Sequence, residues 1–595
     1  MKKYLLICTI FIQMLIGQSI KPVDYVDPMI GTGDSRWMLY PGPSMPFGMV
    51  KLSPDNQKAG WKAGYEYEIE NIMGFSHIHS WTMGGLLFMP TTGALKIVPG
   101  GENSPDSGYR SRFDHDNEKA EAGYYSVYLD DYDVRAELTT TTRVGFHRYT
   151  FNENDKARIL IDLKFPTEYN FKVLEAKIEK VSDTEIHGYT LQQATYGADY
   201  NKYKLNFVIR FDKNIAELDF WKNGDIIKNK AALEGKDDLG IIANFDLNPG
   251  EIVQAQCGIS FVSIEQAKIN LEKELNSFDW NFDAVKRFNK QTWNELLSKI
   301  KVSGGRKKDR VKFYTNLYRS YCSRTIMSDV NGKYTDMYER TRQLDDPDSP
   351  VYGCDAFWNS FWNLNILWNL ITPDITNKWV NSLLEIYDRG GWLPKGPAGI
   401  EYSAIMVGSH EIPFIVAAYQ HGIREYDIEK AYQAIKEIQM KPGRDHPAGG
   451  RVGNKHLKSY LELGFVPADT GPVSNTLDYC YDDFCVAQMA KALGELDDYE
   501  YFLQRSKNYQ NVFNPNVMYP WIRKRDGEFK GNFGIYNGMQ TDFWDGKGFV
   551  EGNAWQYNWY VPHDVQGMIN QMGNELFVER LNEGFIDSEA NNFSA

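Results

Sequence analysis

The sequence is poor in cysteine and has no excess of positive charge. Six cysteines occur in 595 residues, without Cys-x-x-Cys spacing, which argues against a disulfide framework and a thiolate zinc site. Lys and Arg number 65 against 79 Asp and Glu, giving a net charge of −14. This charge argues against binding to a phosphate backbone, so nucleic acid is not an expected partner.

Long hydrophobic runs are also missing, apart from a short one at the N-terminus. Lys2 and Lys3 precede an apolar run over residues 4–16, which ends in Gly-Gln-Ser. A membrane span needs about 20 apolar residues, so residues 1–19 indicate a secretory signal peptide and not a membrane anchor. We expect an exported protein, periplasmic or extracellular, without a membrane span.

Common motifs for nucleotides and catalytic zinc are absent as well. No Gly-x-x-x-x-Gly-Lys loop occurs. The segment His410-Glu-Ile-Pro-Phe414 has Phe where a zinc protease needs its second histidine. We therefore expect neither a nucleotide-binding protein nor a zincin.

Aromatic residues are abundant, at 14% of the chain, and the spacing of apolar residues along the sequence changes near residue 270. Before that point, β-branched and aromatic runs such as residues 134–151 and 158–163 are bounded by Gly, Asn and Asp, as in strands. After it, apolar residues recur every three to five positions, which predicts helices near 358–388, 409–421, 427–439, 476–493, 497–514 and 560–583. The pattern favours a β-sandwich followed by an α/α barrel.

One carboxylate stands among aromatic residues. In Gly548-Phe-Val-Glu551-Gly-Asn-Ala-Trp-Gln-Tyr557, Glu551 has apolar neighbours and a following glycine that permits close approach of a ligand. Such surroundings raise the pKa of a carboxyl, as the proton donor of a glycosidase requires. From these residues alone, a helix-capping or ion-paired glutamate is the alternative.

Several ordered motifs resemble one family over nearly the whole mature length. They are Val26-Asp-Pro-Met-Ile-Gly-Thr-Gly33 and residues 40–55, 74–79, 313–319, 391–395, 408–410, 551–557 and 561–564. On these motifs the chain resembles the calcium-dependent α-mannosidases of glycoside hydrolase family 92. The resemblance implies an N-terminal β-sandwich packed on a C-terminal (α/α)6 barrel.

From the resemblance we expect a signal peptide at 1–19, the β-sandwich domain at 22–265, a helical linker at 266–300 and the catalytic barrel at 301–595. It implies inverting hydrolysis of terminal α-linked mannose in mannan or N-glycan-type oligosaccharides, with Glu551 as general acid and calcium as cofactor. Inversion needs a base about 6.5–9.5 Å from the acid, so that a water fits between them.

The sequence departs from the family pattern in two places. The family's Gly-Asn-Asp-Asp segment, which carries the base, would follow about a hundred residues after Glu551, but the sequence ends at Ala595. We therefore expect a C-terminally truncated member, with the base beyond the chain end and little activity in the chain as given. Where the family has Trp-Asp-x-x-Arg, this chain reads Trp358-Asn359-Ser-Phe-Trp362, which puts the preference for mannose in doubt.

Further substrate-binding candidates lie in the matched loops. They are Trp358, Asn359, Trp392, Lys395, His410, Gln556, His77, His79 and Trp81. His410 could instead be a histidine between the domains whose hydrogen bonds are all made by protein groups. His77 and His79 could instead form a paired-histidine metal site. Gln556 could orient the acid without binding the sugar. No metal ligand is assigned.

Two other functions remain open. An inverting glycoside phosphorylase has the same two-domain fold and uses phosphate in place of a base. A catalytically inactive glycan-binding protein would use the aromatic pocket without turnover. Product formation that depends on phosphate would identify the phosphorylase. Glycan binding without any product would identify the inactive binding protein.

Overall fold

The computed structural model describes residues 20–33, 39–57, 64–80, 83–152, 156–164, 171–194, 202–354, 357–403, 407–531 and 548–589. The predicted signal peptide and Trp81 lie outside these ranges. The chain divides into two compact units, residues 1–335 with 341–354, and residues 336–340 with 355–595. The domain boundaries expected from the sequence stay a prediction. Within the described ranges, no helix is long and apolar enough to cross a membrane.

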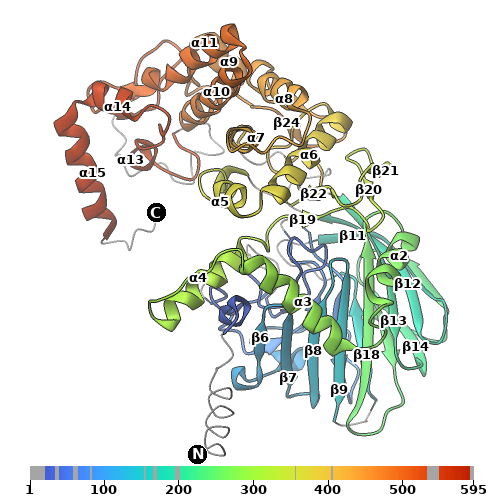
Figure 1. The fold of residues 1–595 in the computed structure, drawn as a ribbon. Helices are drawn as coiled ribbons and strands as arrows, with labels where there is room; N and C mark the ends of the chain where they lie inside the picture. Colours follow the sequence, from blue (N-terminus) through green and yellow to red (C-terminus); the bar gives the residue numbers. More distant parts are fainter. Residues whose placement is uncertain are drawn as a thin grey trace, which may run out of the picture. The chain divides into compact units, whose positions relative to one another are not determined.

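The first unit consists mainly of two large antiparallel sheets (Figure 1). The nine-stranded sheet has the order β16 (Ala232–Gly235), β11 (Phe171–Lys180), β12 (Glu185–Ala194), β13 (Lys202–Phe211), β18 (Glu251–Ser260), β9 (Val144–Phe151), β8 (Val134–Thr140), β7 (Tyr124–Leu129), β6 (Lys119–Glu121). The seven-stranded sheet has the order β1 (Ser53–Asp55), β3 (Gly74–Ser76), β4 (Leu87–Thr91), β10 (Arg158–Asp162), β17 (Leu239–Asn244), β14 (Glu217–Lys222), β15 (Asp225–Ile227).

Side chains that point alternately to the two faces of β9 explain how the sheets pack. His147 and Tyr149 point toward the seven-stranded sheet, where the His147 ring centroid lies 4.6 Å from that of Phe88 and the Tyr149 centroid 6.3 Å from that of Phe75. Phe146 points to the other face and lies 5.3 Å from Phe282, centroid to centroid. Because side chains of a strand alternate between faces, one strand serves both the sandwich core and its helical cover.

Helices α2 (Ile264–Leu275) and α3 (Phe282–Leu297) provide this cover, and Figure 1 shows them against the nine-stranded sheet. Each begins at a side-chain cap, because Ser263 Oγ accepts from the amide of Gln266 at 3.2 Å and Asn281 Oδ1 from that of Ala284 at 3.0 Å. Helix α4 (Lys307–Arg319) follows in the same unit, with the short pairs β2 (Asn71–Ile72)–β5 (Ser111–Arg112), β19 (Thr325–Ile326)–β22 (Tyr352–Gly353) and β20 (Lys333–Thr335)–β21 (Thr341–Gln343).

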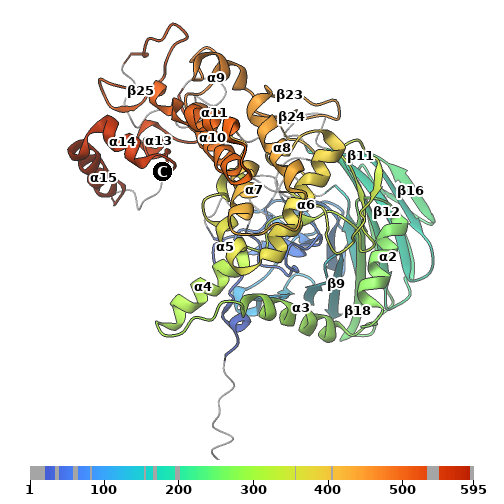
Figure 2. The ribbon, with the colours of Figure 1, turned by 45° about the horizontal axis from the view of Figure 1, so that its top comes forward.

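The second unit is helical (Figure 2). Its main helices are α5 (Leu364–Ile371), α6 (Pro373–Gly390), α7 (Glu411–Gln420), α8 (Ile428–Met440), α9 (Leu457–Leu463), α10 (Ser474–Leu493), α11 (Leu496–Arg505), α13 (Ala554–Tyr557), α14 (Val565–Met572) and α15 (Asn574–Glu589). Short pieces complete it: η5 (Phe357–Asn359), η6 (Ser506–Val512), β23 (Arg444–Asp445), β24 (Arg451–Val452), β25 (Phe513–Asn514) and β26 (Tyr519–Pro520). This order, a β-sandwich followed by a helical unit, confirms the predicted fold.

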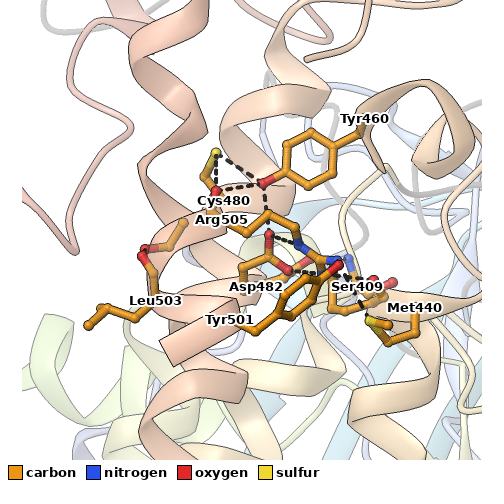
Figure 3. A network of polar contacts seen from close by, with 11 residues as sticks. Ser409, Met440, Tyr460, Cys480, Asp482, Tyr501, Leu503 and Arg505 are labelled. Carbon is orange, nitrogen blue, oxygen red and sulfur yellow. Dashed lines mark hydrogen bonds and ion pairs between the residues drawn. The ribbon is translucent and has the colours of Figure 1, made fainter. Parts of the chain in front are cut away.

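Helix α10, with 14 of its 20 residues buried, is held by a buried ion pair. Asp483 is fully buried, and its carboxylate accepts from Arg505 Nε at 2.7 Å and from the Tyr460 hydroxyl at 2.7 Å. Arg505 also donates to the Gln439 carbonyl at 2.7 Å. Figure 3 shows Arg505 with Tyr460 and Tyr501 around it. These bonds join the ends of α8 and α11 to the middle of α10.

Candidate active site

Glu551 lies on a short turn between a buried segment and helix α13. Phe549 and Val550 are 0% and 1% exposed, whereas Glu551 is exposed, so its carboxyl is less enclosed than its apolar neighbours in the sequence suggest. Its φ of 46° is left-handed, a conformation that costs a non-glycine residue energy and that proteins tend to keep at functional sites. The backbone thus presents one carboxylate at the edge of a buried aromatic cluster.

Hydrogen bonds fix both ends of this turn. The Val473 amide donates to the Gly548 carbonyl at 2.8 Å, the Val550 amide to Ser474 Oγ at 3.1 Å, and the Tyr557 hydroxyl to the Val550 carbonyl at 2.8 Å. On the other side, Asn553 begins α13 with a capping box. Gln556 belongs to that box, because its Oε1 accepts from the Asn553 amide at 3.1 Å.

His410 is buried at the start of α7 in a polar chain that ends near α13. Its Nδ1 lies 3.0 Å from Asp482 Oδ1, and its Nε2 lies 3.0 Å from the Tyr560 hydroxyl. The ring of Trp358 meets it edge-on at a centroid distance of 6.4 Å. The structure thus brings the predicted residues His410 and Trp358 together, while Asn359 ends the adjacent turn η5.

Lys395 and Trp392 lie in a second buried group of the same unit. Lys395 Nζ donates to the Gly453 carbonyl at 3.3 Å, and burial lowers the pKa of this ammonium to about 8. The nearby carboxylates Glu411, Asp482 and Asp478 act against that shift. Burial raises the pKa of Asp478 to about 7 and that of Glu411 well above its ordinary value. Trp392 is 7% exposed, and its carbonyl accepts from the Tyr402 hydroxyl at 2.7 Å.

His77 and His79 are buried in the first unit and have protein partners. His77 Nδ1 donates to the Leu86 carbonyl at 2.8 Å, and its Nε2 lies 3.1 Å from His147 Nε2. His79 Nδ1 donates to the Lys51 carbonyl at 2.8 Å, and its Nε2 lies 3.0 Å from Asp55 Oδ1. Burial lowers the pKa of His77 to about 4. A sugar-binding role for these two histidines and for Trp81, which lies outside the described residues, stays a prediction.

The residues that hold the Glu551 turn were not selected from the sequence. Ser474, Asp478 and Asp482 follow one another at intervals of four on α10, which places them on one helix face. Polar residues that recur along one face of a buried helix are the sequence signal for a buried polar network. The Tyr557 hydroxyl and Ser474 both bind Val550, which brings the α13 segment to the first of these residues.

Models of one family match both units. The description "Glycosyl hydrolase family 92 N-terminal domain" applies to residues 25–260 and "Glycosyl hydrolase family 92 catalytic domain" to residues 266–594. Among solved structures, a family GH92 α-mannosidase of Bacteroides thetaiotaomicron is 31% identical with a TM-score of 0.85, over 95% of this chain and 74% of that one.

A family GH92 inverting mannosidase of Bacteroides thetaiotaomicron VPI-5482 is 25% identical with a TM-score of 0.84, over 95% of this chain and 74% of that one. A relative described as an uncharacterized secreted glycosidase of Arthroderma benhamiae is 26% identical, over 94% of this chain and 73% of its own length. With both of its units matched by models of the same family, the chain belongs to glycosyl hydrolase family 92 and is a glycosidase.

Proposed function

We propose that the protein hydrolyses terminal α-mannosides with inversion, and that Glu551 is the general acid. The observation that carries the proposal is the Glu551 turn, where a left-handed backbone presents an exposed carboxyl beside buried aromatic residues. Membership of the family supports it, as does the α-mannosidase relative, which has been solved in complex with mannoimidazole. Mannose-containing oligosaccharides are therefore the proposed substrates.

In the proposed reaction, the Glu551 carboxyl gives its proton to the glycosidic oxygen as the bond from that oxygen to C1 breaks. A water attacks C1 from the opposite face of the sugar and gives its proton to a base there, so that the configuration at C1 inverts. The products are mannose and the shortened oligosaccharide. Trp358, Asn359, Trp392, Lys395, His410 and Gln556 are the proposed sugar-binding residues of the helical unit.

The resemblance also implies calcium, and the described part of the chain does not supply an evident site for it. In those ranges, no three His, Cys, Asp or Glu side chains are arranged to hold a metal ion. Glu411, Asp482 and Asp478 already have a positive neighbour in Lys395, because their charges raise its pKa. We therefore assign no step of the reaction to calcium.

Export by an N-terminal signal peptide is the proposed route out of the cytoplasm. The relative from Arthroderma benhamiae is described as secreted. N-terminal sequencing of the exported protein should find a start near residue 20, and an uncleaved Met1 would contradict this proposal.

The reaction is tested with Glu551→Gln, which keeps the size of the side chain and removes its acidic proton. We expect turnover of an α-linked mannobiose to fall about 100- to 10,000-fold. Turnover of 2,4-dinitrophenyl α-mannoside should be largely kept, because that leaving group departs without protonation. The exposed residue Glu575, on α15, provides the control Glu575→Gln, which should change neither rate.

The anomer of mannose that is released first shows whether the reaction inverts or retains the configuration at C1. For inversion, proton NMR at early times should show β-mannose first. Unchanged turnover of mannobiose by Glu551→Gln would overturn the acid assignment. Mannose release that does not depend on phosphate would support the hydrolase, whereas release only with phosphate would indicate a phosphorylase.

A further inference from the structure

The backbone of Val550, the residue that leads into Glu551, is held on both sides by side chains from two helices. The Val550 amide is bound by Ser474, the first residue of α10, and the Val550 carbonyl by Tyr557, the last residue of α13. We propose that Tyr557 and Ser474 are the positioning residues that aim the Glu551 carboxyl. The inference rests on the proposed role of Glu551 and identifies what fixes its direction.

Across the described residues, no hydrogen bond or ion pair reaches the Glu551 carboxylate. Among these residues, the backbone that carries Glu551 is therefore what fixes the position and direction of its Cα–Cβ bond. That backbone is left-handed at Glu551, and a left-handed residue relaxes unless its surroundings hold it in place. The two bonds to Val550 hold it on the N-terminal side.

Tyr557 also supports the C-terminal side of the same turn. A Cβ added at Gly552 would lie 2.8 Å from Cε2 of the Tyr557 ring, so the ring packs directly against the glycine that follows Glu551. One tyrosine therefore binds the residue before the acid through its hydroxyl and the residue after it through its ring. The glycine at 552 is needed because any side chain there would displace that ring.

Tyr557 is itself fixed in place by aromatic neighbours. Its ring centroid lies 5.5 Å from that of Phe549 and 5.7 Å from that of Tyr560. The Tyr560 hydroxyl lies 3.0 Å from His410 Nε2, and His410 Nδ1 lies 3.0 Å from Asp482 on α10. The turn is thus connected to α10 twice, directly through Ser474 and indirectly through Tyr557, Tyr560, His410 and Asp482.

Such support matters because proton donation depends steeply on geometry. A displacement of about 1 Å at a reacting group can cost about a hundredfold in rate. Loss of one Val550 bond would let the peptide before Glu551 rotate, and the carboxyl would move with it. Binding of the sugar ring, which depends on other residues, should change little.

The experiment compares Tyr557→Phe and Ser474→Ala with Tyr479→Phe. Tyr479 is a matched control, because it is fully buried on α10 and its hydroxyl accepts from the backbone amide of His456 at 3.3 Å, not from the Glu551 turn. Calorimetry measures the affinity for mannoimidazole and for mannose. The imidazole nitrogen takes the place of the glycosidic oxygen and bonds to the acid, whereas mannose does not require that bond.

We expect Tyr557→Phe, Ser474→Ala and Glu551→Gln each to weaken mannoimidazole binding about tenfold, and mannose binding less than about twofold. Tyr479→Phe should change neither. If Glu551→Gln weakens mannoimidazole but the two positioning variants do not, the inference is wrong and the proposed function stands. If Glu551→Gln has no effect, or the unaltered protein binds neither sugar, the proposed function fails and the inference with it.

Hydrogen exchange tests the same point without any ligand. In Tyr557→Phe, the backbone amides of Val550 and Glu551 should exchange at least about tenfold faster, while those of Tyr479→Phe stay as in the unaltered protein. Unchanged exchange in Tyr557→Phe would show that its hydroxyl does not hold the turn, and would overturn the inference whatever the calorimetry finds.

Discussion

At the scale of single residues, Lys51 is the least expected side chain of the first unit. It is 2% exposed, and its ammonium donates to Thr325 Oγ1 at 2.6 Å, Gly48 O at 3.0 Å and Ser80 Oγ at 3.2 Å. Within the described part of the chain, no carboxylate binds it. Burial lowers its pKa from 10.5 to about 8. A buried ammonium bound only by uncharged oxygens is costly, so the native state favours loss of its proton.

This predicts a rise in stability with pH. Between pH 8 and 10.5 the unfolded chain binds a proton at Lys51 that the native chain has lost, so raising the pH favours the native state, by about 3 kcal/mol across the window. In Lys51→Met this contribution should vanish. The measurement is urea unfolding of both proteins at several pH values, which gives the difference between their free energies of unfolding at each pH.

Lys230 is exposed in the same unit, and the control Lys230→Met should keep the rise in stability with pH. A pH-independent difference between Lys51→Met and the unaltered protein would contradict the prediction.

At the scale of elements, α10 organises the helical unit through two successive aspartates. Asp482 accepts from the Ser409 amide at 2.8 Å and thereby anchors the start of α7, while Asp483 binds Arg505 at the end of α11. Residues adjacent in sequence lie about 100° apart around a helix, so one dipeptide serves two different neighbours. Seven successive residues at its start, Ser474 to Cys480, are all buried, so this part of the helix is enclosed around its circumference.

Asp483→Asn tests the second of these tasks. The substitution keeps the shape of the side chain but leaves the buried guanidinium of Arg505 without its counter-ion, which should cost about 3–5 kcal/mol of stability. Urea unfolding of the helical unit measures it. The exposed Asp497 on α11 supplies the control Asp497→Asn, expected to change stability by less than about 0.5 kcal/mol. Equal effects of the two substitutions would show that the ion pair does not stabilise α10.

At the scale of the whole molecule, an apolar face on α15 stands out. Val578, Leu581, Phe585 and Ile586 are 55%, 39%, 62% and 68% exposed, and their spacing places them along one side of the helix. Contiguous exposed apolar side chains promote association. The rest of the surface carries an excess of negative charge that opposes it.

Replacing Phe585 and Ile586 by Lys should reduce self-association of the 595-residue chain several-fold. Sedimentation velocity over a range of concentrations measures this, and the melting temperature should change little because both side chains are exposed. Val181→Lys, at an exposed apolar residue of the first unit, is the control. If the control reduced association as much as the α15 variant, the face would have no special part in it.

Periodicity and motifs predicted the fold, but they did not predict the hydrogen bonds that hold the Glu551 turn. The predicted helices near 409–421, 427–439 and 476–493 correspond to α7, α8 and α10, because their apolar spacing is regular. Short α9 was missed, since its seven residues are too few for a periodic pattern. Ser474 and Tyr557 could not be found from local sequence, because their importance comes from one hydrogen bond each to a residue 76 or 7 positions away.

The five described cysteines are all buried thiols, so their reactivity reports local opening of the protein. Cys257 lies in β18 of the first unit and Cys480 in α10 of the second. Alkylating reagents need an exposed thiolate, and burial raises the pKa of both thiols, so neither reacts until its surroundings open. The alkylation rate at each cysteine, read by mass spectrometry, therefore reports how often the sandwich and the helical unit open, each independently of the other.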